Sequence, residues 1–147
     1  MSDNKSQASK QAALCFVDSN VWLYIFLPGQ DKNKAAIAKR LIQQKKSNIV
    51  VSTQVINEIM RNLFRNKAIS EVQARHLIRA FYQEYQVVPV NEPVQIQASM
   101  LREKYSFSYW DSLITAAALE SKAVTLYSED MQDGLTLEKQ LTIVNPF

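Results

Sequence analysis

The sequence contains only two glycines, Gly29 and Gly134, among its 147 residues. Phosphate-binding loops and dinucleotide-binding turns need several glycines, because their backbone must approach the phosphates closely. The chain therefore carries neither. It also has a single histidine, His76, and a single cysteine, Cys15, which excludes a zinc site of the usual Cys/His kind. A Ser-His-Asp triad would depend on His76, which lies in a helical pattern with no serine elbow nearby, so carboxylates remain for chemistry.

Long hydrophobic runs are missing too. The longest, "VWLYIFL" from Val21 to Leu27, is far too short to cross a membrane, so we expect no membrane association. A lone cysteine cannot form an internal disulfide, so we expect Cys15 in the core of a protein from a reducing compartment, the cytoplasm. Residues 1–13 are polar and lack a stretch of signal-peptide type, which predicts a flexible segment ahead of one domain over residues 14–147.

The composition, 47% hydrophobic and 21% charged with a net charge of +3, suits a globular domain and permits a polyanionic partner without requiring one. Short runs rich in β-branched residues alternate with longer helical patterns. Strand-like runs cover 14–18, 48–52, 86–90 and 124–128, with a last one at 141–144 that we expect at the edge of the sheet. Helical patterns cover 19–27, 32–46, 53–66, 91–105 and 111–121, and a further helix follows the capping-box sequence "SEVQ" at 70–73. This alternation predicts an α/β fold with a mostly parallel sheet covered on both faces.

Four carboxylates fall near one edge of this predicted sheet. Asp18 follows the first strand and Asp130 follows the fourth, while Asp111 opens a helix and Glu58 lies about one turn into another. Ligands in such sheets bind outside the carboxyl ends of the strands. We therefore expect the four side chains to share one cleft.

Each carboxylate also has an ordinary explanation. Asp18 could cap the following helix, and Glu58 could pair with Arg61 or Asn62 on an exposed helix face. Asp111 fits a capping box in "SYWD", and Asp130 could be a turn residue. The four together at one edge are harder to explain in this way. Carboxylates sharing a cleft repel one another unless a cation lies among them, and oxygen ligands of this kind suit Mg²⁺ or Mn²⁺. A metal-dependent phosphoryl hydrolase is the function that this pattern favours.

At these positions the sequence resembles a PIN domain, and most of all the VapC-type toxin ribonucleases of bacterial toxin–antitoxin pairs. "FVDSNVWLY" resembles the family's opening motif, and "STQVINEIMRNLFR" resembles its second acidic helix. "YWDSLITAAALESKAVTLYSEDMQDG" resembles the segment that carries the third and fourth acids. The resemblance runs from about Leu14 to the end of the chain.

This resemblance implies a three-layer α/β/α sandwich with a central parallel sheet. It implies Mg²⁺- or Mn²⁺-dependent cleavage of single-stranded RNA that leaves a 3′-hydroxyl and a 5′-phosphate. The metal-binding catalytic acids carried over by position are Asp18, Glu58, Asp111 and Asp130.

The same resemblance implies supporting residues. Asn20 would orient Asp18 or a metal-bound water, and Ser128 would do the same near Asp130. Asp133 is an alternative to Asp130 as the fourth acid.

The resemblance also implies partners: a second copy in a homodimer, and an antitoxin protein whose tail crosses the acidic cleft. Arg61 and Arg65 could steer an RNA backbone toward the cleft, and Tyr109 could stack a base. Two rival hypotheses stay open. One is a PIN-fold module that binds protein or RNA with little catalysis, and the other is a structure-specific DNA nuclease.

Overall fold

The computed structural model describes residues 13–147. The flexible segment expected over residues 1–13 lies almost entirely outside the described residues. The expected α/β fold with a mostly parallel sheet is confirmed. The elements are β1 Cys15–Val17, α1 Ser19–Phe26, α2 Lys32–Lys45, a 3₁₀ turn η1 Lys46–Asn48, β2 Ile49–Ser52, α3 Thr53–Arg65, α4 Glu71–Glu84, β3 Gln86–Val88, α5 Glu92–Lys104, α6 Tyr109–Glu120, β4 Thr125–Tyr127, β5 Thr136–Leu137 and β6 Leu141–Val144.

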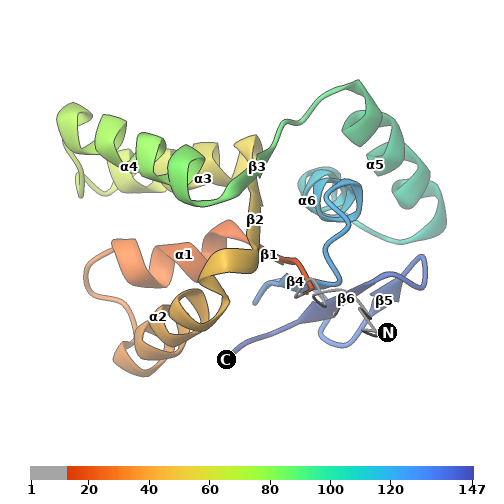
Figure 1. Cartoon of the computed structure of the whole chain (residues 1–147), viewed down its shortest axis with the longest axis horizontal. Helices are drawn as coiled ribbons and strands as arrows, with labels where there is room; N and C mark the ends of the chain where they lie inside the picture. Colours follow the sequence, from red (N-terminus) through yellow and green to blue (C-terminus); the bar gives the residue numbers. More distant parts are fainter. Residues whose placement is uncertain (1–12) are drawn as a thin grey trace, which may run out of the picture.

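The helices form two layers around the sheet. Figure 1 shows α1 to α4 gathered on one side of the strands and α5 with α6 on the other. Within these layers α1 packs on α2 and α3, and α5 packs on α6. This is the three-layer sandwich expected from the sequence.

The strand order β3-β2-β1-β4-β6-β5 places β1 in the interior of the sheet, parallel to both β2 and β4. The chain first builds outward from β1 to β2 and β3, and then crosses over to β4 on the other side. The order therefore reverses between β1 and β4. A reversal of this kind leaves a crevice at the carboxyl ends of the two strands, where open α/β proteins bind their ligands.

The prediction that residues 141–144 form the edge strand is wrong. β6 lies between β4 and β5, and the short strand β5 forms the edge by pairing antiparallel with β6. The turn of this hairpin places Glu138 and Lys139 in the left-handed region, with φ of 51° and 54°. Because non-glycine residues seldom adopt this conformation, nothing in the sequence indicated a turn here.

The predicted burial of one face of α3 and of Cys15, and the predicted capping box, agree with the structure. The stripe Val55, Ile59 and Leu63 of α3 is buried, as is Cys15. Ser70 and Gln73 make both bonds of the predicted capping box. In residues 13–147, no helix has the length and hydrophobicity needed to cross a membrane.

Candidate functional site

Asp18 lies at the junction of β1 and α1, at the point where the strand order reverses. Its side chain is only 5% exposed. Oδ1 accepts a hydrogen bond from the Ser19 amide at 2.7 Å, and Asp18 is the N-cap of α1. Oδ2 accepts from Ser128 Oγ at 2.9 Å, across the interface between β1 and β4. The Asp18 carboxylate therefore caps α1 and also lies at the edge of the sheet where the strand order reverses.

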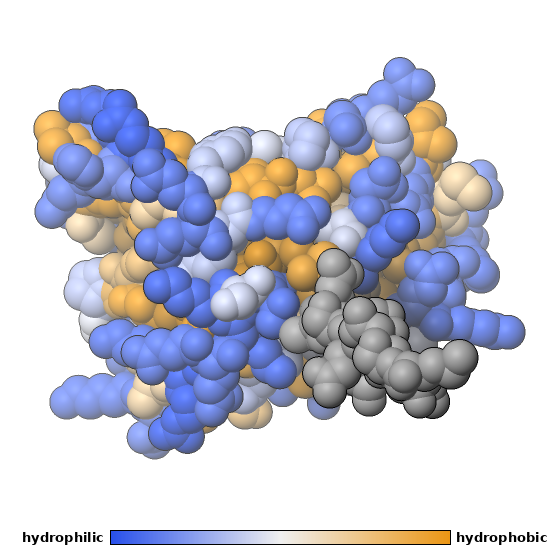
Figure 2. All heavy atoms as spheres, viewed as in Figure 1, coloured by the Kyte–Doolittle hydropathy of each residue, from blue (hydrophilic) through white to orange (hydrophobic). Residues whose placement is uncertain are grey.

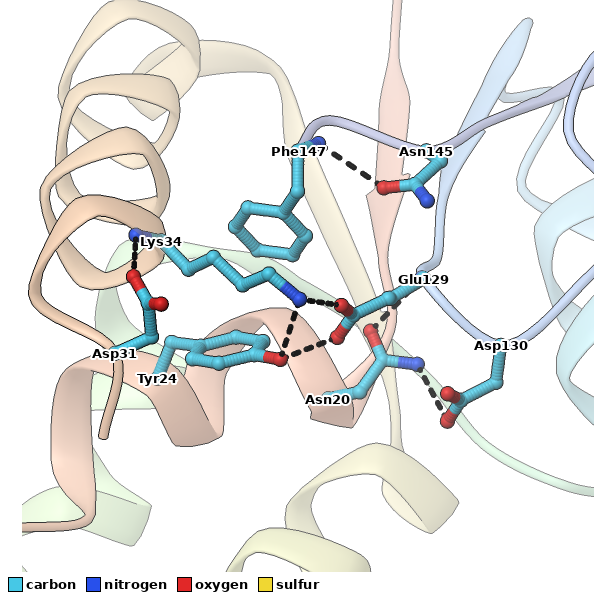
Figure 3. A network of polar contacts seen from close by, with 8 residues as sticks. All are labelled: Asn20, Tyr24, Asp31, Lys34, Glu129, Asp130, Asn145 and Phe147. Carbon is cyan, nitrogen blue, oxygen red and sulfur yellow. Dashed lines mark hydrogen bonds and ion pairs between the residues drawn. The ribbon is translucent and has the colours of Figure 1, made fainter. Parts of the chain in front are cut away.

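Asn20, in the first turn of α1, ties the loop that follows β4 to this helix. Its Nδ2 lies 3.1 Å from Asp130 Oδ2 and 3.2 Å from Ser128 Oγ, while its Oδ1 accepts from the Glu129 amide at 3.3 Å. Figure 3 shows Asn20 between Glu129 and Asp130. The contact from Nδ2 to Asp18 Oδ2 is longer, at 3.4 Å. Asn20 thus orients Asp130 more directly than Asp18, while Ser128 orients Asp18.

Glu58 faces the Asp18 junction from α3. Ser19 Oγ donates to its Oε2 at 2.5 Å, and Gln54 Nε2 donates to its Oε1 at 2.8 Å. The alternative of a pair with Arg61 or Asn62 is not what the structure has: Asn62 Nδ2 donates to the backbone carbonyl of Glu58, not to its carboxylate. Within residues 13–147 no ion pair joins Glu58 to Arg61.

Asp111 is the third residue of α6, since the helix begins at Tyr109, two residues before the predicted start. Its amide donates to Ser108 Oγ at 3.1 Å, which is one half of a capping box. Across the described part of the chain the reciprocal bond, from the Ser108 amide to the Asp111 carboxylate, is not made. The Asp111 carboxylate is half-buried and lies within electrostatic range of Glu58 and Asp130.

Burial and the charges of neighbouring carboxylates raise the pKa values of Asp18 and Asp111. The pKa of Asp18 is raised from 3.8 to about 7, and burial is the largest cause. The hydrogen bonds from Ser128 and the Ser19 amide oppose this rise, and the negative charges of Glu58 and Asp111 contribute to it. Burial is also the largest cause of the raised pKa of Asp111, with Asp130 and Glu58 adding to it. Four elements thus bring four carboxylates to one edge of the sheet, where their neighbours' charges disfavour the ionisation of Asp18 and of Asp111.

The donor set is of the kind that Mg²⁺ or Mn²⁺ prefers. Oxygen ligands alone are present, without histidine or thiolate. Among residues 13–147, however, no three acidic, histidine or cysteine side chains lie close enough together to hold a metal ion as they stand. Mg²⁺ commonly binds through one or two carboxylates and keeps several waters. The carboxylates in this part of the chain are therefore suitable ligands for Mg²⁺, and they do not surround a metal position on all sides.

The remaining predicted residues lie in different surroundings. Asp133 is exposed, and its Oδ1 accepts from the Asn145 amide at 2.9 Å, so it joins the loop between β4 and β5 to the residue that follows β6. Arg61 and Arg65 are both exposed on α3, and Arg61 lines a cavity beside Glu58. Tyr109 is exposed, with the Arg102 guanidinium 4.9 Å from its ring centroid.

Two residues near the acids did not emerge from the sequence. Ser19 bridges Asp18 and Glu58, and Gln54 bridges Glu58 and the Trp110 carbonyl at 3.3 Å. Their positions in the sequence are the signal that could have identified them: Ser19 directly follows Asp18, and Gln54 lies four residues before Glu58, on the same face of the helix. Gln54 Nε2 donates to two acceptors, and Gln54 Oε1 is buried with no partner in the described residues.

A second polar network, formed by Tyr24, Lys34 and Glu129, holds the loop that follows β4. Lys34 and Tyr24 both hydrogen-bond to Glu129, and the Lys34 ammonium lies 5.7 Å from the ring centroid of Phe147 (Figure 3). Burial would raise the pKa of Glu129, but the hydrogen bonds from Lys34 and Tyr24 lower it below its ordinary value. Glu129 directly precedes Asp130, so this network and Asn20 together fix the position of that loop.

The fold and the site define an α/β protein with four carboxylates at the switch point of its sheet. The chain belongs to the PIN domain family, whose model matches residues 15–132. No curated protein matches the sequence significantly.

Solved structures share the fold. A toxin–antitoxin complex from Klebsiella pneumoniae aligns with a TM-score of 0.69 at 16% identity, covering 90% of this chain and 98% of that one. VapC20 from Mycobacterium tuberculosis, described as a sarcin-ricin loop cleaving toxin, aligns with a TM-score of 0.63 at 22% identity, covering 79% and 89%. DNA-bound VapBC from Salmonella typhimurium aligns with a TM-score of 0.66 at 13% identity, covering 92% and 100%. At these identities the likeness establishes the fold.

Proposed function

We propose that the chain is a Mg²⁺- or Mn²⁺-dependent endoribonuclease that cleaves single-stranded RNA, and that it is the toxin of a toxin–antitoxin pair. The observation that carries the proposal is the gathering of Asp18, Glu58, Asp111 and Asp130 at the carboxyl edge of the sheet, where Ser19 joins Asp18 to Glu58 and Asn20 joins Asp18 to Asp130. Keeping four carboxylates together destabilises the metal-free protein, and a bound divalent cation would relieve that repulsion. Membership of the PIN domain family and the toxins among its structural neighbours support the same function.

The residues divide into ligands and positioning groups. When bound, the cation would activate a water and neutralise charge on the phosphate. Asp18, held by Ser128, is the central ligand, and Glu58 is held toward it by Ser19. Asn20 holds Asp130 near Asp18, because its Nδ2 lies close to both carboxylates.

The Asn20 contact favours Asp130 over Asp133 as the fourth acid, because the Asp133 carboxylate is already bonded to the Asn145 amide.

The partners that we propose are an antitoxin and a second copy of the chain, in the cytoplasm. Several structural neighbours are complexes of a toxin with its antitoxin. A groove of about 390 Å³ between α1, α2 and α4 is lined largely by apolar side chains, among them Ile25, Phe26, Ile42 and Leu77. Such a groove would accept the apolar face of a helix. Co-purification with the product of a neighbouring gene, and light scattering of the isolated chain, test the two partners separately.

The nuclease is tested with a mixed pool of cellular RNA, incubated with the purified protein in Mn²⁺ and in EDTA. We expect cutting in Mn²⁺ alone, and none by Asp18→Asn. Asp130→Asn should abolish cutting while Asp133→Asn keeps it, which makes this pair a matched control within one loop. Equal cutting by wild type and Asp18→Asn would indicate a contaminating nuclease. Digestion of flapped DNA in place of RNA would favour the DNA nuclease.

A binding module remains the second candidate, favoured by the absence, within residues 13–147, of three acids grouped closely enough to hold a metal. Asp111→Asn separates the two functions. An enzyme should lose cleavage and keep its fold, as judged by circular dichroism, whereas a module should keep its binding. Calorimetric titration with Mn²⁺ adds a readout that does not depend on the RNA sequence chosen.

A further inference from the structure

A cavity of about 580 Å³ opens directly beside Glu58. Its walls come from the first half of α3, from Val90 after β3 and from the start of α6. Figure 2 shows the surface notched between the α3–α4 pair and the α5–α6 pair, with hydrophobic side chains in the notch. The volume is in the range of small-ligand sites. Glu58 lines this cavity and is joined to Asp18 through Ser19, so a ligand that fills the cavity contacts one of the four acids and lies close to the rest of the candidate site.

Trp110 forms the aromatic wall of this cavity. Its side chain is 63% exposed, whereas Trp22, the only other tryptophan, is 2% exposed. The neighbouring Tyr109 already has the Arg102 guanidinium over its ring and meets Trp110 edge to face, with ring centroids 5.1 Å apart. Trp110 is therefore the better stacking surface of the two, a role that the sequence had suggested for Tyr109.

The polar groups of the cavity suit a nucleotide. Asn57 is exposed in the cavity and offers an amide donor and an acceptor, the pair that reads the edge of a base. Arg61, one turn further along α3, supplies a positive charge for a phosphate. Gln54 bonds to both Glu58 and the Trp110 carbonyl, so it fixes the aromatic wall relative to the acid.

We propose that this cavity binds the nucleobase adjacent to the scissile phosphate of single-stranded RNA. The base stacks on Trp110, Asn57 hydrogen-bonds to its edge, and Arg61 contacts the neighbouring phosphate. This inference rests on the proposed ribonuclease function and adds to it a subsite that selects the base at the cut. Stacking tolerates any base because each has a π face, so the selectivity comes from Asn57.

The structure supplies its own reporter for the test. Trp22 is buried, so a change in tryptophan emission or in quenching by acrylamide reports on Trp110. Short single-stranded RNA homopolymers are titrated into the protein in EDTA, where no metal-dependent cutting occurs. We expect quenching of the emission and protection of Trp110 from acrylamide.

Variants are compared by the anisotropy of labelled RNA. Trp110→Ala should raise Kd about tenfold, within the range measured for base–aromatic stacking. Trp110→Phe should restore most of the affinity. Tyr82→Ala is the matched control, because Tyr82 is 55% exposed on α4 and lies outside this cavity. Asn57→Ala should change the base preferred at the cut sites.

Two results would overturn the subsite. One is RNA binding by Trp110→Ala equal to wild type, in a variant whose circular dichroism is native. The other is protection of Trp110 without RNA that grows with protein concentration, which would assign this face to contact between two copies. If Asp18→Asn abolishes cutting while Trp110→Ala binds RNA and cuts the same sites as wild type, the subsite fails and the nuclease stands. If the wild type does not cut RNA in Mn²⁺ but Trp110→Ala still weakens RNA binding, the nuclease fails and the subsite stands.

Discussion

Replacing Asp18 by asparagine should stabilise the metal-free protein at and above neutral pH, although it removes the central acid of the site. Asp18 is buried, and its pKa is raised from 3.8 to about 7 chiefly by that burial. Asparagine has nearly the same shape and no charge. The substitution therefore removes the cost of holding an ionised carboxylate inside the protein.

The raised pKa fixes the sign of the pH dependence. Below pH 3.8 Asp18 is protonated in both the folded and the unfolded state, so it costs nothing. As the pH rises toward about 7 the unfolded chain loses this proton more readily than the folded one, and stability falls. Above that pH the cost is complete, at roughly 4 kcal/mol, because each pH unit between the two pKa values is worth about 1.4 kcal/mol.

Asparagine does not recover all of this energy. Its Oδ1 can accept from the Ser19 amide, but its Nδ2 then faces Ser128 Oγ and the Asn20 amide in place of a carboxylate oxygen. Weakening these bonds costs about 1–2 kcal/mol. The net gain in the free energy of unfolding is then about 2–3 kcal/mol at pH 8, or a rise in Tm of roughly 4–10 °C for a chain of this length.

The assay is thermal unfolding in EDTA at a series of pH values from 5 to 8. At pH 5 the folded wild type keeps Asp18 mostly protonated and avoids more than half of the cost, so the two Tm values should converge. Asp133→Asn makes the same chemical change at an exposed carboxylate and should leave a much flatter difference. A wild type more stable than Asp18→Asn by the same amount at every pH would refute the electrostatic reasoning.

Three further predictions concern metal, the β4 loop and the core. Millimolar Mn²⁺ should raise the Tm of wild type but not that of Asp18→Asn, and an equal rise in both would show that the metal binds elsewhere. Lys34→Met should lower the Tm near neutral pH by removing the ion-pair partner of Glu129, which keeps only Tyr24 among the described residues. Because the pKa of Glu129 is lowered, a pH series of melts should show this difference vanish as the pH falls through that pKa. Leu126→Ala, at a fully buried position of β4, should cost about 2–5 kcal/mol in urea unfolding, and a cost below 1 kcal/mol would mean that this site repacks.

The convergence of the acids was predictable because parallel strands place their carboxyl ends at a common edge. Asp18 and Asp130 follow strands, so their approximate positions depend only on the order of the elements. Glu58 could be placed as well, because the stripe Val55, Ile59 and Leu63 leaves it off the buried face of α3. Periodicity thus decides which face a side chain takes.

Periodicity does not decide which hydrogen bonds a side chain makes. Ser128 and Asn20 were expected near these acids, yet their main partners are exchanged: Ser128 bonds to Asp18, and Asn20 bonds to Asp130. The outcome depends on the parallel register of β1 and β4, which pairs Val17 with Tyr127 and so brings the next residues, Asp18 and Ser128, side by side. A sequence without pairing information does not contain that register.

The two aspartates that follow strands show what the rest of the fold adds. By sequence alone Asp18 and Asp130 are alike, each at the end of a short apolar run. In the structure Asp18 is buried with a pKa of about 7, because α1 begins immediately after it and β4 lies alongside, whereas Asp130 is exposed on a loop. Removing the charge of Asp18 should therefore change stability strongly with pH, and removing that of Asp130 should do so weakly. Melts of Asp18→Asn and Asp130→Asn in EDTA across the same pH range measure this contrast, and equal pH dependence would mean that burial does not distinguish the two acids.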